Sequence, residues 1–94
     1  MSVVALKRIS QPITPLDGTE HLDTITTNGT YHQDFTVNAT AELGYPARVA
    51  GLLEVHSPDA AMVYQRYTAI WSGTMYYRGS YRGEWKPWRK VQAE

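Results

Sequence analysis

The chain has 94 residues, and we predict a single domain, because two domains would leave each half too small to bury a stable core. It contains no cysteine, which excludes disulfides, thiolate metal sites and cysteine nucleophiles. The net charge is zero, but residues 1–61 carry three basic and seven acidic side chains, while residues 62–94 carry six basic and two acidic ones.

This charge asymmetry has three interpretations. It indicates a basic stripe for an anionic ligand, an acidic half that packs on the basic half of another copy, or two solvated faces. The longest apolar run is far below the roughly 20 residues of a membrane span, and residues 1–9 lack the basic start and long apolar core of a signal peptide. We therefore expect no membrane insertion.

The first 18 residues are predicted to be an extended N-terminal arm or linker. Residues 1–9 form a short apolar lead, and residues 11–18 are rich in turn formers. Pro12 and Pro15 favour extended geometry in the residues before them and prevent a helix from running through. Residues 19–94 are predicted to form the β domain.

The middle of the chain predicts a turn, two strands and a loop. Leu22 and Ile25 can anchor one turn, and Asn28 followed by glycine favours a tight turn into a strand over residues 30–37. The composition of residues 38–48 predicts a loop that pivots at residues 44–46. Residues 49–56 then form the second strand.

The last third predicts a three-stranded meander. Its strands are residues 61–71, 74–81 and 85–91, joined by short turns, and Pro87 places the last strand at an edge or a bend. Both faces of the meander mix apolar with polar residues, which favours contacts on both sides: the core on one, a partner chain or ligand on the other. The predicted fold class is mainly β, with a small antiparallel sheet.

No catalytic or cofactor-binding motif is present in the sequence. His21, His32 and His56 have no recurring metal-ligand spacing, and the carboxylates near residue 20 are typical of turns and helix caps. There is no phosphate-binding glycine loop, nucleophile elbow or metalloprotease histidine pair. We expect no enzyme activity, no cofactor and no metal.

Basic and aromatic residues alternate between residues 76 and 90, a combination that can stack bases and pair phosphates. The neutral charge of the chain and the lack of an RNA-binding signature argue against this, and cation–π pairs within the sheet explain the same residues. A nucleic-acid-binding β module is therefore an alternative that the sequence does not favour.

Five sequence segments occur in a familiar order: LDTITTNGTY at residues 22–31, GLLEV at 51–55, YQRYT at 64–68, YYRGSY at 76–81 and WKPWRK at 85–90. Together they resemble the knob module of R-type pyocin and bacteriophage tail fibres, over roughly residues 21–91. Members of that family usually follow a long shaft, whereas about 20 residues precede the motif here. This difference fits a complete small gene product, and a fragment of a longer fibre is the alternative.

The resemblance implies a small β domain, commonly trimeric, in a viral appendage that contacts the host surface. We expect a phage virion protein of the tail-fibre knob type, made in the bacterial cytoplasm. Its arm would dock on other virion proteins. A capsid-decorating or head-fibre protein is the alternative within the virion. The implied homotrimer also agrees with a meander that has two mixed faces.

A glycan or partner contact is predicted around the turn at residues 72–73. Sugar rings present flat apolar faces edged by hydroxyls, so a glycan site needs exposed aromatics flanked by polar groups. The residues that offer this are Trp71, Tyr76, Tyr77, Arg78 and Tyr81. The competing interpretation is that these aromatics cover the core or seal a subunit interface. Trp85 and Trp88, three residues apart, are predicted to differ in role.

Overall fold

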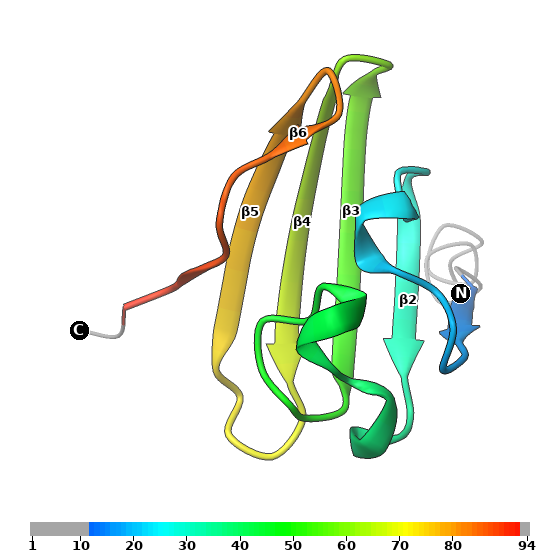
Figure 1. Ribbon diagram of the computed structural model, residues 1–94, viewed down its shortest axis with the longest axis vertical. Helices are drawn as coiled ribbons and strands as arrows, with labels where there is room; N and C mark the ends of the chain where they lie inside the picture. The colour runs from blue at the N-terminus through cyan, green and yellow to red at the C-terminus, as the bar shows by residue number, and fades with distance from the viewer. Residues whose placement is uncertain (1–11, 93–94) are drawn as a thin grey trace, which may run out of the picture.

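The structure, a computed structural model, describes residues 12–92 and is built mainly of strands (Figure 1). The strands are β1 (Ile13–Leu16), β2 (Gly29–Gln33), β3 (Gly51–Asp59), β4 (Met62–Ala69), β5 (Met75–Tyr81), β6 (Glu84–Trp85) and β7 (Arg89–Lys90). Three 3-10 turns connect them: η1 (Leu22–Thr24), η2 (Thr36–Asn38) and η3 (Ala41–Leu43). The mainly β prediction is confirmed. Among residues 12–92 no helix is long and apolar enough to cross a membrane.

All strands belong to one sheet in the order β1-β2-β3-β4-β5-β6, with β7 also paired to β5. Strands β3, β4 and β5 form the antiparallel centre, as predicted for the first two strands of the meander. The predicted third strand over residues 85–91 is wrong as one continuous strand. It is split into β6 and β7 around Pro87, which has no N–H to donate to a ladder.

The predicted arm is extended where the structure describes it, and it also takes part in the sheet. Strand β1 pairs in parallel with β2, Thr14 opposite Tyr31, and Leu16 is buried in the core. Pro15 is tolerated because β1 is an edge strand. The apolar lead predicted for residues 1–9 lies outside the described residues.

The strand predicted over residues 30–37 ends early, at Gln33. The Gln33 side chain accepts a hydrogen bond from the Phe35 N–H (3.0 Å), and η2 begins directly afterwards. Phe35 and Val37, which belong to the predicted strand, lie outside β2 and are 63% and 68% exposed. A local side-chain bond to the backbone thus competes with the sheet and ends it. The loop predicted after residue 38 is confirmed, with Gly44 in the left-handed region (φ 85°).

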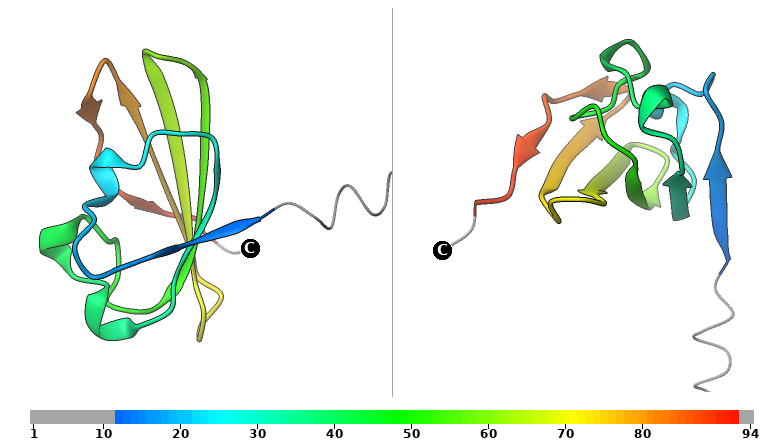
Figure 2. Two further views of the ribbon diagram at one scale, coloured as in Figure 1. Left: turned by 90° about the vertical axis from the view of Figure 1, so that its right-hand side faces the viewer. Right: turned by 90° about the horizontal axis from the view of Figure 1, so that it is seen from below.

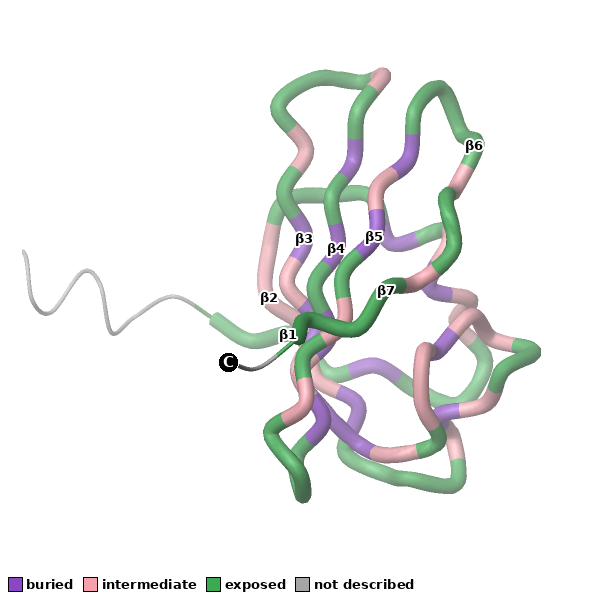
Figure 3. The backbone as a smooth tube through the Cα atoms, turned by 90° about the vertical axis from the view of Figure 1, so that its left-hand side faces the viewer, coloured by how far each residue is buried: buried purple, intermediate pink, exposed green. Residues whose placement is uncertain are grey.

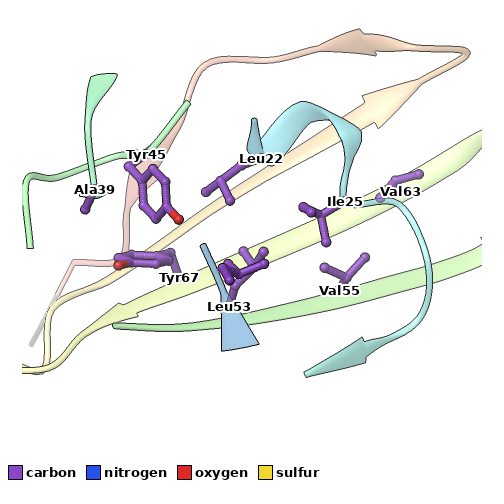
Figure 4. Close-up of a cluster of buried hydrophobic side chains, with 9 residues drawn as sticks. Leu22, Ile25, Ala39, Tyr45, Leu53, Val55, Val63 and Tyr67 are labelled. Atoms are coloured by element: carbon purple, nitrogen blue, oxygen red, sulfur yellow. The ribbon is translucent and has the colours of Figure 1, made fainter. Parts of the chain in front are cut away.

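The hydrophobic core lies on one face of the sheet, beneath the 3-10 turns (Figure 4). Leu22 of η1, one of the two predicted anchors, packs with Leu53 and Tyr67 of the central strands, and all three are fully buried. The Tyr45 and Tyr67 rings meet edge to face, with centroids 5.5 Å apart. Burial consequently alternates along β3, β4 and β5 (Figure 3).

Two buried glutamines on the sheet form hydrogen bonds to the loops that cover it. Gln65 of β4 donates from Nε2 to the carbonyls of Leu22 (2.7 Å) and Ile25 (2.9 Å). Gln33 donates from Nε2 to the Asp17 carbonyl and to the Tyr45 hydroxyl. Polar side chains can be buried here because each has fixed partners.

Candidate functional site

The other face of the sheet is not covered by any described segment. Seen end-on, the 3-10 turns and their loops lie on one side of the strands (Figure 2, right). Six apolar side chains on the uncovered side are between 37% and 56% exposed. We call this surface the open face, and these six residues are Ile13, Met62, Tyr64, Met75, Tyr77 and Tyr81.

The strand register sets the arrangement of the open face. In one cross-strand row, Glu54 of β3 lies opposite Arg66 of β4, and Arg66 lies opposite Tyr77 of β5. The Arg66 Nε is 3.0 Å from the Glu54 carboxylate, so the charges at the centre of the face neutralise each other. The open face is therefore largely apolar and aromatic, with one internal ion pair.

A shallow hollow lies in this face, where β5 has a glycine. Gly79 lies opposite Tyr64, and the hollow of about 440 Å³ between them is lined also by His56 and Tyr77. A Cβ atom at Gly79 would meet its nearest neighbour, the Val63 carbonyl oxygen, at 3.7 Å. The hollow lies where this strand has no side chain, and an added Cβ atom would make only ordinary van der Waals contacts there.

Arg78, between these open-face residues in sequence, points to the opposite side. It is 9% exposed, its Nη2 lies 2.9 Å from Asp23 Oδ1, and its Nε donates to Gln65 Oε1 (2.9 Å). The guanidinium carbon lies 4.1 Å from the ring centroid of Trp85 and 4.5 Å from that of Trp88. Burial lowers the pKa of Arg78, and the nearby Asp23 opposes that shift. Arg78 therefore has a structural role, because it joins Trp85 and Trp88 to Asp23 and Gln65 on the core side of the sheet.

The prediction that Trp85 and Trp88 differ in role is wrong. It assumed a regular strand, in which residues three apart face opposite sides. The break at Pro87 lets both rings stack on Arg78, and Trp88 Nε1 also donates to the Gly44 carbonyl (2.7 Å). Both tryptophans are partly buried against the core.

The structure does not bring the five predicted contact residues onto one surface. Tyr77 and Tyr81 lie on the open face, while Tyr76 and Arg78 point toward the core side, because residues alternate along β5. Trp71 stands apart, 82% exposed in the turn between β4 and β5. Their contact with a glycan or partner stays a prediction.

Sequence reasoning missed Met62, Tyr64 and His56 as members of an exposed surface. The alternation in β4 was visible, but both sets contained apolar and polar side chains, so neither was recognisably outward. Gln65 was misleading in particular: it is a polar residue on the buried side, where two backbone carbonyls of a distant turn satisfy it.

The two edges of the sheet carry opposite charge. Asp17 follows β1 and Asp34 follows β2, and since the two strands are parallel, both lie at the same end, with Glu20 beside Asp17. Hydrogen bonds from the Thr19 backbone and side chain lower the pKa of Asp17. We call these three residues the acidic edge.

The opposite border of the sheet is formed by β5, β6 and β7. Apart from the buried Arg78 it has five charged residues, all exposed, and four of these are basic: Arg82, Lys86, Arg89 and Lys90, with Glu84 as the acid. We call the four basic residues the basic edge. The charge asymmetry of the sequence thus becomes, in the fold, an asymmetry between two opposite edges of one sheet.

No protein-family model and no curated protein matches the chain. Among solved structures, an N-truncated R2-type pyocin tail fibre matches 88% of the chain with 33% identity and a TM-score of 0.79, and the match covers 33% of that fibre chain. The C-terminal part of the P. aeruginosa R1 pyocin fibre matches 89% with 27% identity and a TM-score of 0.70, over 22% of that chain. The chain thus spans a third or less of these fibres. Its resemblance to pyocin tail fibres is confirmed.

Proposed function

We propose that the chain is a structural protein of tail-fibre type in a phage or pyocin-like particle, and that it is not an enzyme. The observation that carries this is the match to the R2-type pyocin tail fibre over 88% of the chain at 33% identity. The uncovered apolar face agrees with a protein that works in contact with others, since monomeric domains rarely leave a large apolar patch exposed.

The first partner that we propose is the chain itself, as a homotrimer. A wild-type sample at micromolar concentration should sediment with about three times the chain mass of 10.6 kDa. The physical reason is burial of the open face, whose exposed apolar side chains gain roughly 25 cal/mol for each Å² removed from water. A single species of 10.6 kDa would contradict the trimer.

Other virion proteins are the second proposed partners, through the N-terminal segment. The matched truncation for testing this removes residues 1–11 and keeps β1, because β1 contributes Leu16 to the core. We expect the truncated protein to fold and to trimerise but to lose incorporation into particles.

A host surface glycan is the third proposed partner, and Trp71 is the residue best placed to contact it. Trp71 is 82% exposed, and Ser72 and Thr74, which follow it in the sequence, have hydroxyls that are hydrogen-bonded to each other at 2.8 Å. An aromatic face flanked by hydroxyls suits a sugar ring. Arg78 is excluded from the proposed glycan site because its side chain is buried.

Trp71→Ala is expected to weaken binding to host cells, or to extracted surface polysaccharide, by at least about tenfold, a loss of about 1.4 kcal/mol. Ile70→Ala is the matched control, since Ile70 is exposed in the same turn and has no ring. Both variants should form oligomers of the same size as the wild type. Wild-type binding by Trp71→Ala would remove this turn from the glycan proposal.

Fractionated particles distinguish the proposed location from its alternatives. If purified particles are separated into tails and capsids, we expect the chain with the tails. Its recovery with capsids would favour a decoration or head-fibre protein instead. A nucleic-acid module would retard DNA or RNA in a gel, with affinity that falls steeply as salt rises.

A further inference from the structure

Four large apolar side chains project from one end of the sheet and belong neither to the core nor to the open face. Phe35 precedes η2 and Val37 lies in it, while Ile70 and Trp71 lie in the turn between β4 and β5. Each of the four is at least 52% exposed. We call these four residues the apolar tip.

The strand register brings the two loops of the apolar tip to the same end of the sheet. Gln33 of β2 and Ala69 of β4 lie in one cross-strand row through β3, so both loops leave the sheet at one level (Figure 1). Neighbouring strands are about 4.8 Å apart, which places the loops roughly 10 Å from each other. Ala50 joins them, because its N–H donates to the Thr36 hydroxyl (3.2 Å) and its carbonyl accepts from the Ile70 N–H (2.9 Å). The four side chains can therefore contact one flat surface.

The two loops that carry the apolar tip are free of charge. Residues 35–41 and 67–77 contain no charged side chain, although 19% of the chain is charged. Their polar side chains include the hydroxyls of Thr36, Ser72 and Thr74. The charges that border the loops, Asp34 and Arg48, are of opposite sign. This surface can therefore leave water without the cost of burying an unpaired charge.

The turn between β4 and β5 projects from the molecule and is not part of a groove. Gly73 has a φ of 71°, and a Cβ atom at this position would meet no atom within 4 Å. Projecting aromatic and aliphatic side chains with hydroxyls beside them suit the interface of a lipid bilayer, where aromatic rings lie at the level of the headgroups. Protein interfaces are enriched in arginine as well as aromatics, and neither loop contains an arginine, so a bilayer fits better.

We propose that the apolar tip enters the headgroup region of a lipid bilayer, as a peripheral contact that does not cross the membrane. The inference goes beyond the proposed glycan contact, with which it shares only Trp71. Because the bordering charges cancel, burial of apolar area carries the binding. The affinity should therefore depend little on anionic lipid or on salt.

Flotation with lipid vesicles tests the contact on the full chain. One set of vesicles contains phosphatidylcholine alone, and the other also contains phosphatidylglycerol. We expect the wild type to bind both sets with affinities within about threefold of each other, and to stay bound at about 1 M salt, where the screening length is only about 3 Å. Brominated phosphatidylcholine should also quench part of its tryptophan fluorescence, a measurement that needs no variant.

One substitution in each loop tests which residues make the contact. Phe35→Ala and Trp71→Ala should each weaken vesicle binding at least about tenfold, because each removes a large apolar side chain from the interface. Phe35→Leu keeps an apolar side chain at the same position and should bind within about threefold of the wild type. Ile13→Ala removes a similarly exposed apolar side chain at the start of β1, away from the tip, and should bind like the wild type. Far-ultraviolet circular dichroism checks that each variant is folded.

Three results would overturn the lipid contact: no binding of the wild type to either set of vesicles, binding that requires phosphatidylglycerol or is lost in salt, or an equal loss with Ile13→Ala. If vesicles do not bind but Phe35→Ala prevents incorporation into particles, the tip contacts a virion protein and the lipid proposal is wrong. The glycan proposal is judged separately. Loss of polysaccharide binding with Trp71→Ala but not with Phe35→Ala would support it, whatever the vesicles show.

Discussion

Replacing Arg78 by methionine is expected to lower the free energy of unfolding by roughly 3 kcal/mol. Methionine keeps the length and an apolar stack between the two tryptophans, so the change isolates the loss of charge and hydrogen bonding. Gln65 Oε1 loses its guanidinium donor in a buried position, and Asp23 Oδ1 loses its ion-pair partner. Denaturant titration followed by tryptophan fluorescence measures the effect.

Two features of the Arg78 site set the size of this loss. Within the described residues, neither Arg78 Nη2 nor Asp23 Oδ1 has a hydrogen-bond partner, so their 2.9 Å ion pair is what compensates both for burial. The Asp23 side chain is 43% exposed, however, so water can reach part of the carboxylate after the substitution. The cost should therefore stay below that of a fully buried orphan charge.

Arg82→Met is the matched control for this substitution. Arg82 is exposed in the turn after β5, with its guanidinium 5.1 Å from the ring centroid of Tyr81. Its replacement should change the free energy of unfolding by no more than about 0.5 kcal/mol. Equal effects of the two substitutions would mean that the buried contacts of Arg78 do not stabilise the domain.

Gly51→Ala is expected to cost about 3 kcal/mol or to prevent folding altogether. A Cβ at this position would overlap the backbone carbonyl oxygen of Thr68 and approach the Tyr67 ring, with Cζ at 2.9 Å. Tyr67 cannot move aside, since it is fully buried and its hydroxyl donates to the Val49 carbonyl (2.6 Å). The neighbouring strand would have to shift. Thermal unfolding measures the loss.

Gly79→Ala provides the comparison, because it adds the same methyl group to a central strand of the same sheet. Its Cβ would lie in ordinary contact, 3.7 Å from the nearest atom, so the thermal midpoint should stay near that of the wild type. A midpoint for Gly51→Ala equal to that of Gly79→Ala would show that β3 and β4 do not pack as closely as described.

The parts that could be predicted from the sequence are those governed by neighbouring residues. The turn anchored by Leu22 and Ile25, the loop pivoting at Gly44 and the hairpin at residues 72–73 are confirmed, because turn formers and alternation act within a few residues of one another. The strand predicted beyond Gln33 was wrong because the Gln33 side chain ends it with a bond to the following backbone.

A small, mainly β domain without cysteine and with opposite charge in its two parts could be predicted from the sequence, and the order of its motifs indicated a tail-fibre module. Tertiary structure alone decided which face of the sheet is covered. Both faces mix apolar with polar residues, so the choice depends on partners far away in the chain: Gln65 bonds to Leu22, 43 residues earlier. Arg78 is buried for the same reason, since Asp23, Trp85 and Trp88 meet around it only in the fold.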